Sequence, residues 1–337
     1  MKLSTYVIKR AGYAIFTLIG LSIFVFVLAR VLPGDPARMA AGPRAPSWVV
    51  EQLREQLWLD KPIYTQYFYW LKDIIHGDLG YSIYTRRSVT QDVIEYLPAS
   101  IQLIILAGIF EVIGALILGV MAGRYSYKWP DNLTRFISYI GISVPAFVWA
   151  IIFQLLFTWV MPIFPTSGMF SPLMIPPPEI TGMSTLDALI TGRFDAFVDV
   201  LWHMVLPALA LCLGGMAQDA RIIRAGMVEN QEKDYIAMAT SHGLPERLVT
   251  SKYLLKPSIV PAVTVMGMDV ASLLGNAFLV EIVFMWPGFS KYGINVMLSK
   301  DLNAIVAVVL IMGLIFAIAN IIVDVIVIHL DPRIGGK

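Results

Sequence analysis

The sequence predicts an all-α membrane protein with six transmembrane helices, a small cap on one side of the membrane and a helical segment on the other. Hydrophobic residues make up 57% of the 337 positions and charged residues only 15%, whereas about a quarter of the residues in a soluble domain carry charge. The net charge of +1 argues against a nucleic-acid partner. The single cysteine, Cys212, excludes an intrachain disulfide and any multi-cysteine metal site within the chain.

The first predicted span is an uncharged run of 19 residues between Arg10 and Arg30. At 1.5 Å per residue it is long enough to cross the hydrocarbon core. Its length, and the absence of a small-x-small cleavage pattern before Pro33, favour a membrane anchor over a secretory signal. Five more charge-poor stretches follow, so the predicted spans are 11–29, 97–122, 136–161, 200–217, 259–280 and 302–328. Six spans place both termini on the same side.

Basic residues in the connections predict the orientation. Lys and Arg occur about twice as densely in one set of connecting segments as in the other, and the denser set lies in the cytoplasm. The predicted cytoplasmic segments are 1–10, 124–135, 218–258 and 330–337, and the predicted outer segments are 30–96, 162–199 and 285–303. We therefore expect a multi-pass protein of the cell membrane with both termini in the cytoplasm.

The outer segment 30–96 is long enough to form a small extracytoplasmic cap. Ser47 is a suitable N-terminal residue for a helix whose apolar residues recur at helical spacing. The aromatic residues between Pro62 and Trp70 are typical of a belt at the membrane surface. A second outer stretch, 162–199, contains Pro176, Pro177 and Pro178 and is predicted to be a constrained loop over the membrane.

The segment 218–258 is the only predicted cytoplasmic region large enough to bind a protein partner. Asp234 fits the start of a short helix, Gly243 fits the left-handed position that ends a helix, and Pro245 fits the first turn of another helix. The pattern predicts a helix, a sharp turn and a second helix. An ordinary helical hairpin between two spans would give the same spacing.

Several kinds of catalytic chemistry have no motif in this chain. GxxxxGK[ST], HExxH and GxSxG are all missing, so the chain lacks a phosphate-binding loop for ATP and the usual hydrolase arrangements. The histidines are scattered over different segments, namely His76, His203, His242 and His329. We predict neither a metal site nor a cofactor, and acidic residues in the spans are the only support for a membrane-embedded enzyme.

Ionisable groups inside the predicted spans are candidates for function, because they are costly in lipid and normally face protein or water. Glu111 lies on a stripe of small residues and is therefore expected to face protein. Asp324 lies near a helix end and is expected to be structural, whereas Asp269 lies deep in the fifth span and is expected to line a path through the membrane. The candidate pathway residues are Glu111, Asp269, Asn276 and Glu281.

Considered together, the residues resemble the permease subunits of ABC importers of the dipeptide, oligopeptide and nickel class, over about residues 5–334. The resemblance rests on the order and spacing of several separate stretches. They are Leu32–Pro36, Leu59–Pro62 with Gln66-Tyr67 and Trp70-Leu71, Gly77–Ser82, Asp234-Tyr235 through Gly243-Leu244, Glu281–Phe284 with Trp286–Gly288, Asn320–Asp324, and Asp331–Ile334.

This resemblance implies that the cytoplasmic helix-turn-helix couples the spans to an ATP-binding subunit. His242 stands where relatives commonly carry Lys or Arg. The implied partners are a second, paralogous permease, two subunits that bind ATP and magnesium, an extracytoplasmic solute-binding protein and membrane lipid. The positions that match the coupling element or flank it are Tyr235, Ala237, Ala239, His242, Gly243, Leu244, Pro245 and Arg247.

The resemblance further implies alternating access driven by ATP hydrolysis on the partner subunits, with no enzymatic activity in this chain. A secondary carrier driven by an ion gradient is the alternative, because such carriers use carboxylates in their spans. The cargo stays open at this point among peptides, oligosaccharides and nickel chelates.

Overall fold

The computed structural model describes residues 3–31, 36–42, 44–56 and 58–330. The regular structure of these residues is helical, apart from one isolated bridge between Tyr81 and Ser88. The all-α fold class is thereby confirmed. The helices are α1 (Leu3–Val31), α2 (Pro36–Ala41), α3 (Ser47–Gln56), α4 (Ile63–Ile75), α5 (Val89–Arg124), α6 (Trp129–Ser143), α7 (Ala146–Gln154), the π-helical η1 (Leu155–Val160), α8 (Ser184–Ile190), α9 (Phe194–Gln231), α10 (Asp234–Ser241), α11 (Glu246–Leu248), the π-helical η2 (Val249–Leu255), α12 (Lys256–Val283), α13 (Phe289–Leu298) and α14 (Leu302–Leu330).

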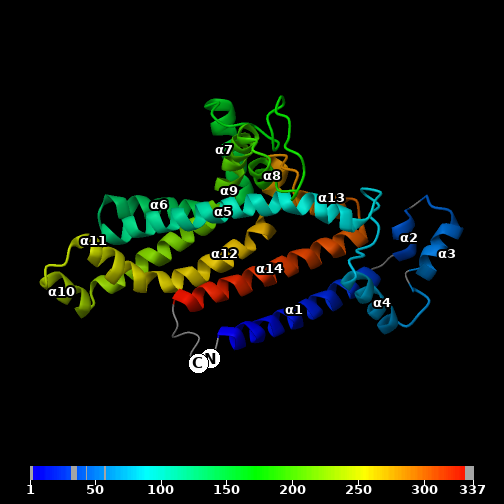
Figure 1. Ribbon diagram of the computed structural model, residues 1–337, viewed down its shortest axis with the longest axis horizontal. Helices are drawn as coiled ribbons and strands as arrows, with labels where there is room; N and C mark the ends of the chain where they lie inside the picture. Colours follow the sequence, from blue (N-terminus) through cyan, green and yellow to red (C-terminus); the bar gives the residue numbers. More distant parts are fainter. Residues whose placement is uncertain (1–2, 32–35, 43, 57, 331–337) are drawn as a thin grey trace.

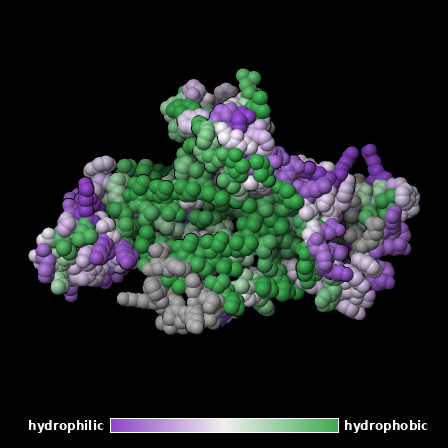
Figure 2. Space-filling view, in the orientation of Figure 1, coloured by the Kyte–Doolittle hydropathy of each residue, from purple (hydrophilic) through white to green (hydrophobic). Residues whose placement is uncertain are grey.

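The long helices α1, α5, α12 and α14 run along the long axis of the molecule (Figure 1). We call the end that carries α10 and α11 the hairpin end, and the opposite end, which carries α2, α3 and α4, the cap end. Figure 2 shows hydrophobic side chains over the middle of the visible face and hydrophilic side chains gathered at both ends. Five helices of the described residues are long and apolar enough to cross a membrane, and a bent pair brings the number to six.

That bent pair replaces the continuous third span expected over 136–161. Helix α6 ends at Ser143, and the pair formed by α6 with α7 and η1 is bent by 108°. Val144 adopts an extended conformation (φ −108°, ψ 125°) because the ring of Pro145 disfavours the helical region for the residue before it. The segment after the bend, with the loop that follows, projects from the side of the long helices (Figure 1).

Helix α9 extends well past the end expected for the fourth span at Ala217. It continues to Gln231 and therefore includes the first part of the segment 218–258, which was expected to be a connection. Helix α10 begins at Asp234 as expected, and Gly243 has the predicted left-handed backbone (φ +72°). Within the described residues, the segment 218–258 is therefore helical over most of its length.

Small residues let α5 and α9 pack closely. The expected stripe on α5 is buried, and it consists of Ala107, Glu111, Ala115, Gly119 and Gly123. A Cβ atom at Gly119 would lie 2.7 Å from Ile223 Cβ and 2.9 Å from the Ala220 carbonyl oxygen. This close approach of two backbones is the reason that glycine is required there.

We expect Gly119→Ala to lower the melting temperature of the purified protein in detergent by several degrees, since the added methyl group has to push α5 and α9 apart. Gly275→Ala is the matched control, because Gly275 also lies inside a long helix, α12, and has no atom within 4 Å of the position of its Cβ. Its melting temperature should be equal to or slightly above that of the wild type. Equal melting temperatures for the two variants would contradict the close-packing interpretation.

Aromatic residues attach the cap to α1. Helix α3 begins at Ser47, as expected, and α4 carries the aromatic residues of the predicted belt. The rings of Tyr67 and Trp70 lie 5.3 and 5.2 Å from that of Phe26, whereas Phe68 is exposed. The belt is therefore divided between rings that hold the cap and rings left on the surface. Two stretches of the family resemblance, residues 32–35 and 331–334, lie outside the described residues.

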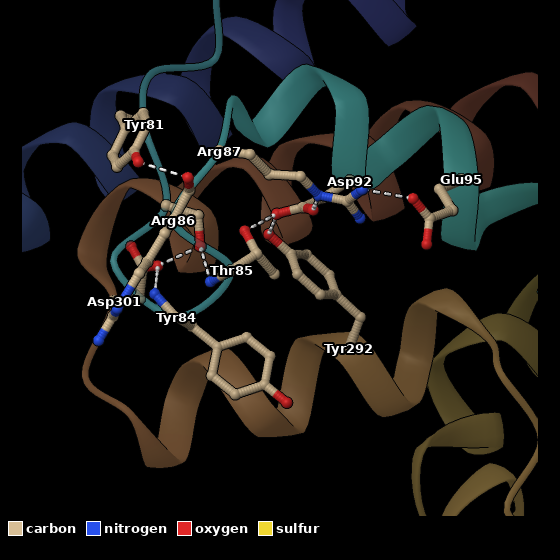
Figure 3. A network of polar contacts seen from close by, with 10 residues as sticks. Tyr81, Tyr84, Thr85, Arg86, Arg87, Asp92, Glu95, Tyr292 and Asp301 are labelled. Carbon is tan, nitrogen blue, oxygen red and sulfur yellow. Dashed lines mark hydrogen bonds and ion pairs between the residues drawn. The ribbon is translucent and has the colours of Figure 1, made fainter.

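A polar network joins the loop before α5 to three helices (Figure 3). The buried Asp92 of α5 accepts hydrogen bonds from Thr85 Oγ1 (2.6 Å), Tyr292 Oη (2.9 Å) and Arg87 Nε. Burial, and then this bond to Asp92, raise the pKa of Tyr292 above its usual range. Asp301, also buried, accepts hydrogen bonds from Ser82 Oγ (2.6 Å) and from the Tyr84 amide (3.1 Å). The network fixes the cap loop on α5, α13 and the start of α14.

Candidate functional site

The hairpin formed by α10, the turn after it and α11 is the first candidate site. Its turn closes with two backbone hydrogen bonds, from the Leu244 amide to the Ala239 carbonyl (3.3 Å) and from the Gly243 amide to the Thr240 carbonyl (2.9 Å). This pair of bonds is the Schellman motif, which requires the left-handed residue that Gly243 supplies. Pro245 comes directly before α11, so the chain turns sharply and starts the next helix at once.

The hairpin has an inner and an outer face. Ile236 and Ala239 are buried in a cluster with Val249, Leu254 and Met266, so one face of α10 packs against the long helices. The outer face exposes the candidate coupling residues Tyr235, Ala237, His242, Gly243, Pro245 and Arg247, together with Met238. Leu244 is half-buried against the cluster. Ala239 was expected among the contact residues, but it supports α10 from inside because its side chain faces the long helices.

Polar contacts attach the hairpin to α9 and α5, and a further bond attaches α9 to α12. Tyr235 Oη donates a hydrogen bond to Asn230 Oδ1 on α9 (2.7 Å), and Asn230 Nδ2 donates to Ser258 Oγ on α12 (2.9 Å). Arg124, at the end of α5, forms an ion pair with Glu246 of α11 (2.8 Å). The hairpin is therefore joined directly to α5 and α9, and it reaches α12 through Asn230 and through η2.

The second candidate site is a cavity of about 440 Å³ between the long helices. Three of the four candidate pathway residues line it, namely Glu111 of α5 with Asp269 and Asn276 of α12. Asp269, which was expected to line a path through the membrane, thus lies in the wall of this cavity. Val144 and Pro145 also line the cavity, so the break between α6 and α7 forms part of its wall.

Sequence reasoning missed a third carboxyl group beside this cavity. Asp219 of α9 is fully buried, and its carboxyl group lies with those of Glu111 and Asp269 in a cluster whose candidate ligand atoms are all within 4.8 Å of one another. It was missed because the fourth span was expected to end at Ala217. The spacing of Gly215, Asp219 and Ile223 on one face of α9 was the signal for burial against another helix.

The fourth candidate pathway residue, Glu281, does not line this cavity. It is fully buried outside the cavity, where it accepts hydrogen bonds from Ser100 Oγ and from the Lys291 amide (2.7 Å). Ser100 Oγ in turn accepts a hydrogen bond from the Phe289 amide (2.7 Å). Glu281 therefore connects the end of α12 with α5 and the start of α13. Both of its carboxyl oxygens are occupied by these contacts.

Asp324 has the structural environment expected for it. Its carboxylate forms an ion pair with Arg10 of α1 (3.0 Å), so it joins the first and last long helices. Asp324 is thus separate from the carboxyl groups of Glu111, Asp219 and Asp269, which lie together beside the cavity.

Comparison with known proteins identifies the family. Residues 115–336 match the family described as "Binding-protein-dependent transport system inner membrane component", and residues 3–104 match its N-terminal companion, "Binding-prot-dependent transport system membrane comp, N-term". The chain belongs to this family. It is therefore a multi-pass permease subunit of a binding-protein-dependent ABC importer.

The relatives of this permease match it over nearly their whole length. It is 34% identical to the probable D,D-dipeptide transport system permease protein DdpB of Escherichia coli K12, over 97% of this chain and 96% of that protein. It is 33% identical to the dipeptide transport system permease protein DppB of Alkalihalophilus pseudofirmus, over 98% of both chains. It is also 33% identical to the glutathione transport system permease protein GsiC of Escherichia coli O6:H1, over 98% of this chain and 99% of that protein.

Family membership decides between the classes of function considered from the sequence. Permeases of this family are transport components without catalytic activity of their own, so the membrane-embedded enzyme is excluded. Their transport depends on a binding protein. The alternative of a secondary carrier driven by an ion gradient is therefore set aside.

Proposed function

We propose that this permease pairs with a second, paralogous permease to form an alternating-access pathway for peptides. A solute-binding protein delivers the peptide to the cap end, which faces outward. Two ATP-binding subunits dock at the hairpin end, which faces the cytoplasm together with both termini. The greater density of basic residues in the connections at the hairpin end supports this orientation.

The observation that carries the proposal is the attachment of the hairpin to α5 and α9, and through Asn230 to α12, with its outer face left exposed. The partner subunits bind and hydrolyse ATP with magnesium, and this chain binds neither. A movement of the docked ATP-binding subunit passes through Arg124, Asn230 and Ser258 to α5, α9 and α12, which are also the helices that surround the cavity. This arrangement links closure of the ATP-binding pair to the shape of the pathway.

Peptides are the cargo that the comparisons support best. Two of the relatives are named for dipeptide transport and one for glutathione, which is itself a short peptide. None of these three is named for an oligosaccharide or a nickel chelate, and we therefore do not extend the proposal to those cargoes.

Cross-linking tests the docking of the hairpin. We expect Met238→Cys in the assembled importer to form a cross-link to an ATP-binding subunit with a short bifunctional maleimide, because Met238 is 64% exposed on the outer face of α10. Ala239→Cys is the matched control from the same helix, since Ala239 is 6% exposed and faces inward. The native Cys212 is fully buried and should not react. Equal cross-linking at both positions, or at neither, would contradict docking through the outer face.

Labelling in intact cells tests the orientation. Leu173, in the loop after the break in the third span, is 98% exposed. We expect a membrane-impermeant maleimide to label Leu173→Cys in intact cells, and to label Met238→Cys only after the membrane has been opened and the ATP-binding subunits have been removed. The reverse order of labelling would invert the proposed orientation.

A further inference from the structure

Three carboxyl groups converge where α5, α9 and α12 meet inside the bundle. Glu111, Asp219 and Asp269 each come from a different helix, and their candidate ligand atoms all lie within 4.8 Å of one another. Glu111 and Asp219 are fully buried, and Asp269 is half-buried. We call these residues the carboxyl cluster.

The carboxyl cluster lacks the partners that buried carboxyl groups normally have. Neither oxygen of Glu111 and neither oxygen of Asp219 takes part in a hydrogen bond within the described part of the chain. Asp269 accepts one bond, from Gln218 Nε2 (3.3 Å). Buried carboxyl groups are stable only when they are paired or hydrogen-bonded, so these oxygens are suited to an external donor.

The surroundings of the carboxyl cluster leave room for such a donor. Glu111 and Asp269 line the cavity of about 440 Å³, which falls within the range of about 300–1,000 Å³ typical of pockets for small organic ligands. The Glu111 carboxyl group packs directly on Gly215 of α9, since a Cβ atom there would lie 2.6 Å from Glu111 Oε1. Ser272 and Asn276 add neutral polar groups to the wall, and Phe278 and Leu279 add apolar surface.

We propose that the carboxyl cluster binds the α-ammonium group of the transported peptide during its passage. This inference rests on the proposed function, since it assigns a binding site to the peptide cargo. An ammonium group has three N–H donors and no acceptor, and the oxygen atoms of the carboxyl cluster can accept hydrogen bonds from these donors. The remainder of the peptide lies in the adjoining cavity, where Asn276 and Ser272 are placed to meet its amide groups.

The shape of the site favours an organic cation over a bare metal ion. Calcium takes about six to eight oxygen ligands that close around it, whereas the carboxyl cluster opens on one side into a cavity far larger than an ion. Because the three carboxyl groups belong to three helices, a relative movement of those helices separates them. The site can therefore hold the peptide in one state of the pathway and release it in another, as transport requires.

The test measures peptide binding to the membrane complex without its binding protein. The two permeases and two ATP-binding subunits are placed together in lipid nanodiscs, and binding of radiolabelled alanyl-alanine and of N-acetyl-alanyl-alanine is measured by equilibrium dialysis. The variants are Glu111→Gln, Asp219→Asn and Asp269→Asn, which replace each carboxyl group with an amide of nearly the same size. Asp324→Asn is the control, because that carboxyl group is also intramembrane but pairs with Arg10.

We expect the wild type and Asp324→Asn to bind the unblocked peptide about tenfold more tightly than the acetylated one, and each variant of the carboxyl cluster to lose this preference. Three results would overturn the proposal: equal binding of the two peptides by the wild type, binding of neither at millimolar concentration, or a preference retained by all three variants. Radioactive calcium that bound stoichiometrically and was lost in the variants would assign the cluster to an inorganic cation instead.

A separate measurement distinguishes failure of this inference from failure of the proposed function. The complete importer with its binding protein is reconstituted in proteoliposomes, and uptake of the same peptide is followed with ATP. If the wild-type importer took up none of the peptides tested, peptide import itself would be contradicted. Uptake by the wild type without any preference in the dialysis experiment would remove only the role assigned to the carboxyl cluster.

Discussion

In the assembled importer, Gly243→Val is expected to leave ATP hydrolysis running while peptide uptake falls by about tenfold or more. Gly243 has φ +72°, and a Cβ atom at this position would meet no atom within 4 Å. The harm therefore comes from the backbone, because a β-branched residue opposes the left-handed conformation by about 1–2 kcal/mol. Relief of this strain opens the Schellman turn and changes the direction of α10 relative to α11.

The measurement compares ATP hydrolysis and uptake in the same proteoliposomes. Gly192→Val is the matched control, because Gly192 has nearly the same backbone angle (φ +70°) and equally open surroundings, but lies between α8 and α9 away from the hairpin. Gly192→Val should keep uptake per ATP close to that of the wild type. The uptake per ATP of Gly243→Asn should lie between that of the wild type and that of Gly243→Val, since asparagine tolerates the left-handed region better than valine does. Normal uptake per ATP in Gly243→Val would refute the coupling role of the turn.

Asp92→Ala is expected to have the largest effect on stability. The substitution removes the acceptor for Thr85, Arg87 and Tyr292 in the network of Figure 3 and leaves the buried Tyr292 hydroxyl without this partner. Loss of one partner from a buried charged network costs about 3–5 kcal/mol. We expect the melting temperature of the protein in detergent to fall by about 10 °C and the amount of folded protein in the membrane to drop with it.

Two variants serve as controls for Asp92→Ala. Tyr292→Phe removes one hydrogen bond from the same network and should cost only about 1 kcal/mol. Asp60→Ala removes an exposed carboxylate that pairs with Lys61, and it should change the melting temperature little because exposed ion pairs contribute little. If Asp92→Ala were as stable as Asp60→Ala, the network would not hold the cap loop.

Features that depend on neighbouring residues in the chain were predictable from the sequence. The all-helical class followed from composition and long apolar runs, the start of α3 followed from Ser47, and the turn after α10 followed from Gly243. These features depend on local backbone preferences and hydrophobic length. Even the break in the third span had a local signal, Pro145, which removes helical freedom from Val144.

The features that were not predicted depend on which helices pack together. Glu281 and Asp269 lie on the same helix and look alike in the sequence. Only the structure shows that Ser100 and the Lys291 amide donate hydrogen bonds to Glu281. Ala239 looked like a contact residue because it is small, yet its side of α10 faces the long helices. Asp219 lay beyond the expected end of a span, and its burial became clear only when α9 was seen to continue toward Gln231.

The uninterrupted course of α9 has a mechanical consequence. The helix has 38 residues, which corresponds to a rod about 57 Å long, and Asp219 and Asn230 lie about 16 Å apart on it with no proline between them. Pro207 lies before the midpoint of the helix, and a tilt of about 5° of the proline-free part about that midpoint moves Asn230 by about 2 Å and Asp219, which is nearer the midpoint, by about 1 Å. Because the hairpin holds α9 through Asn230, we expect a movement of the hairpin to be carried along α9 and to reach the carboxyl cluster at Asp219 with a smaller amplitude.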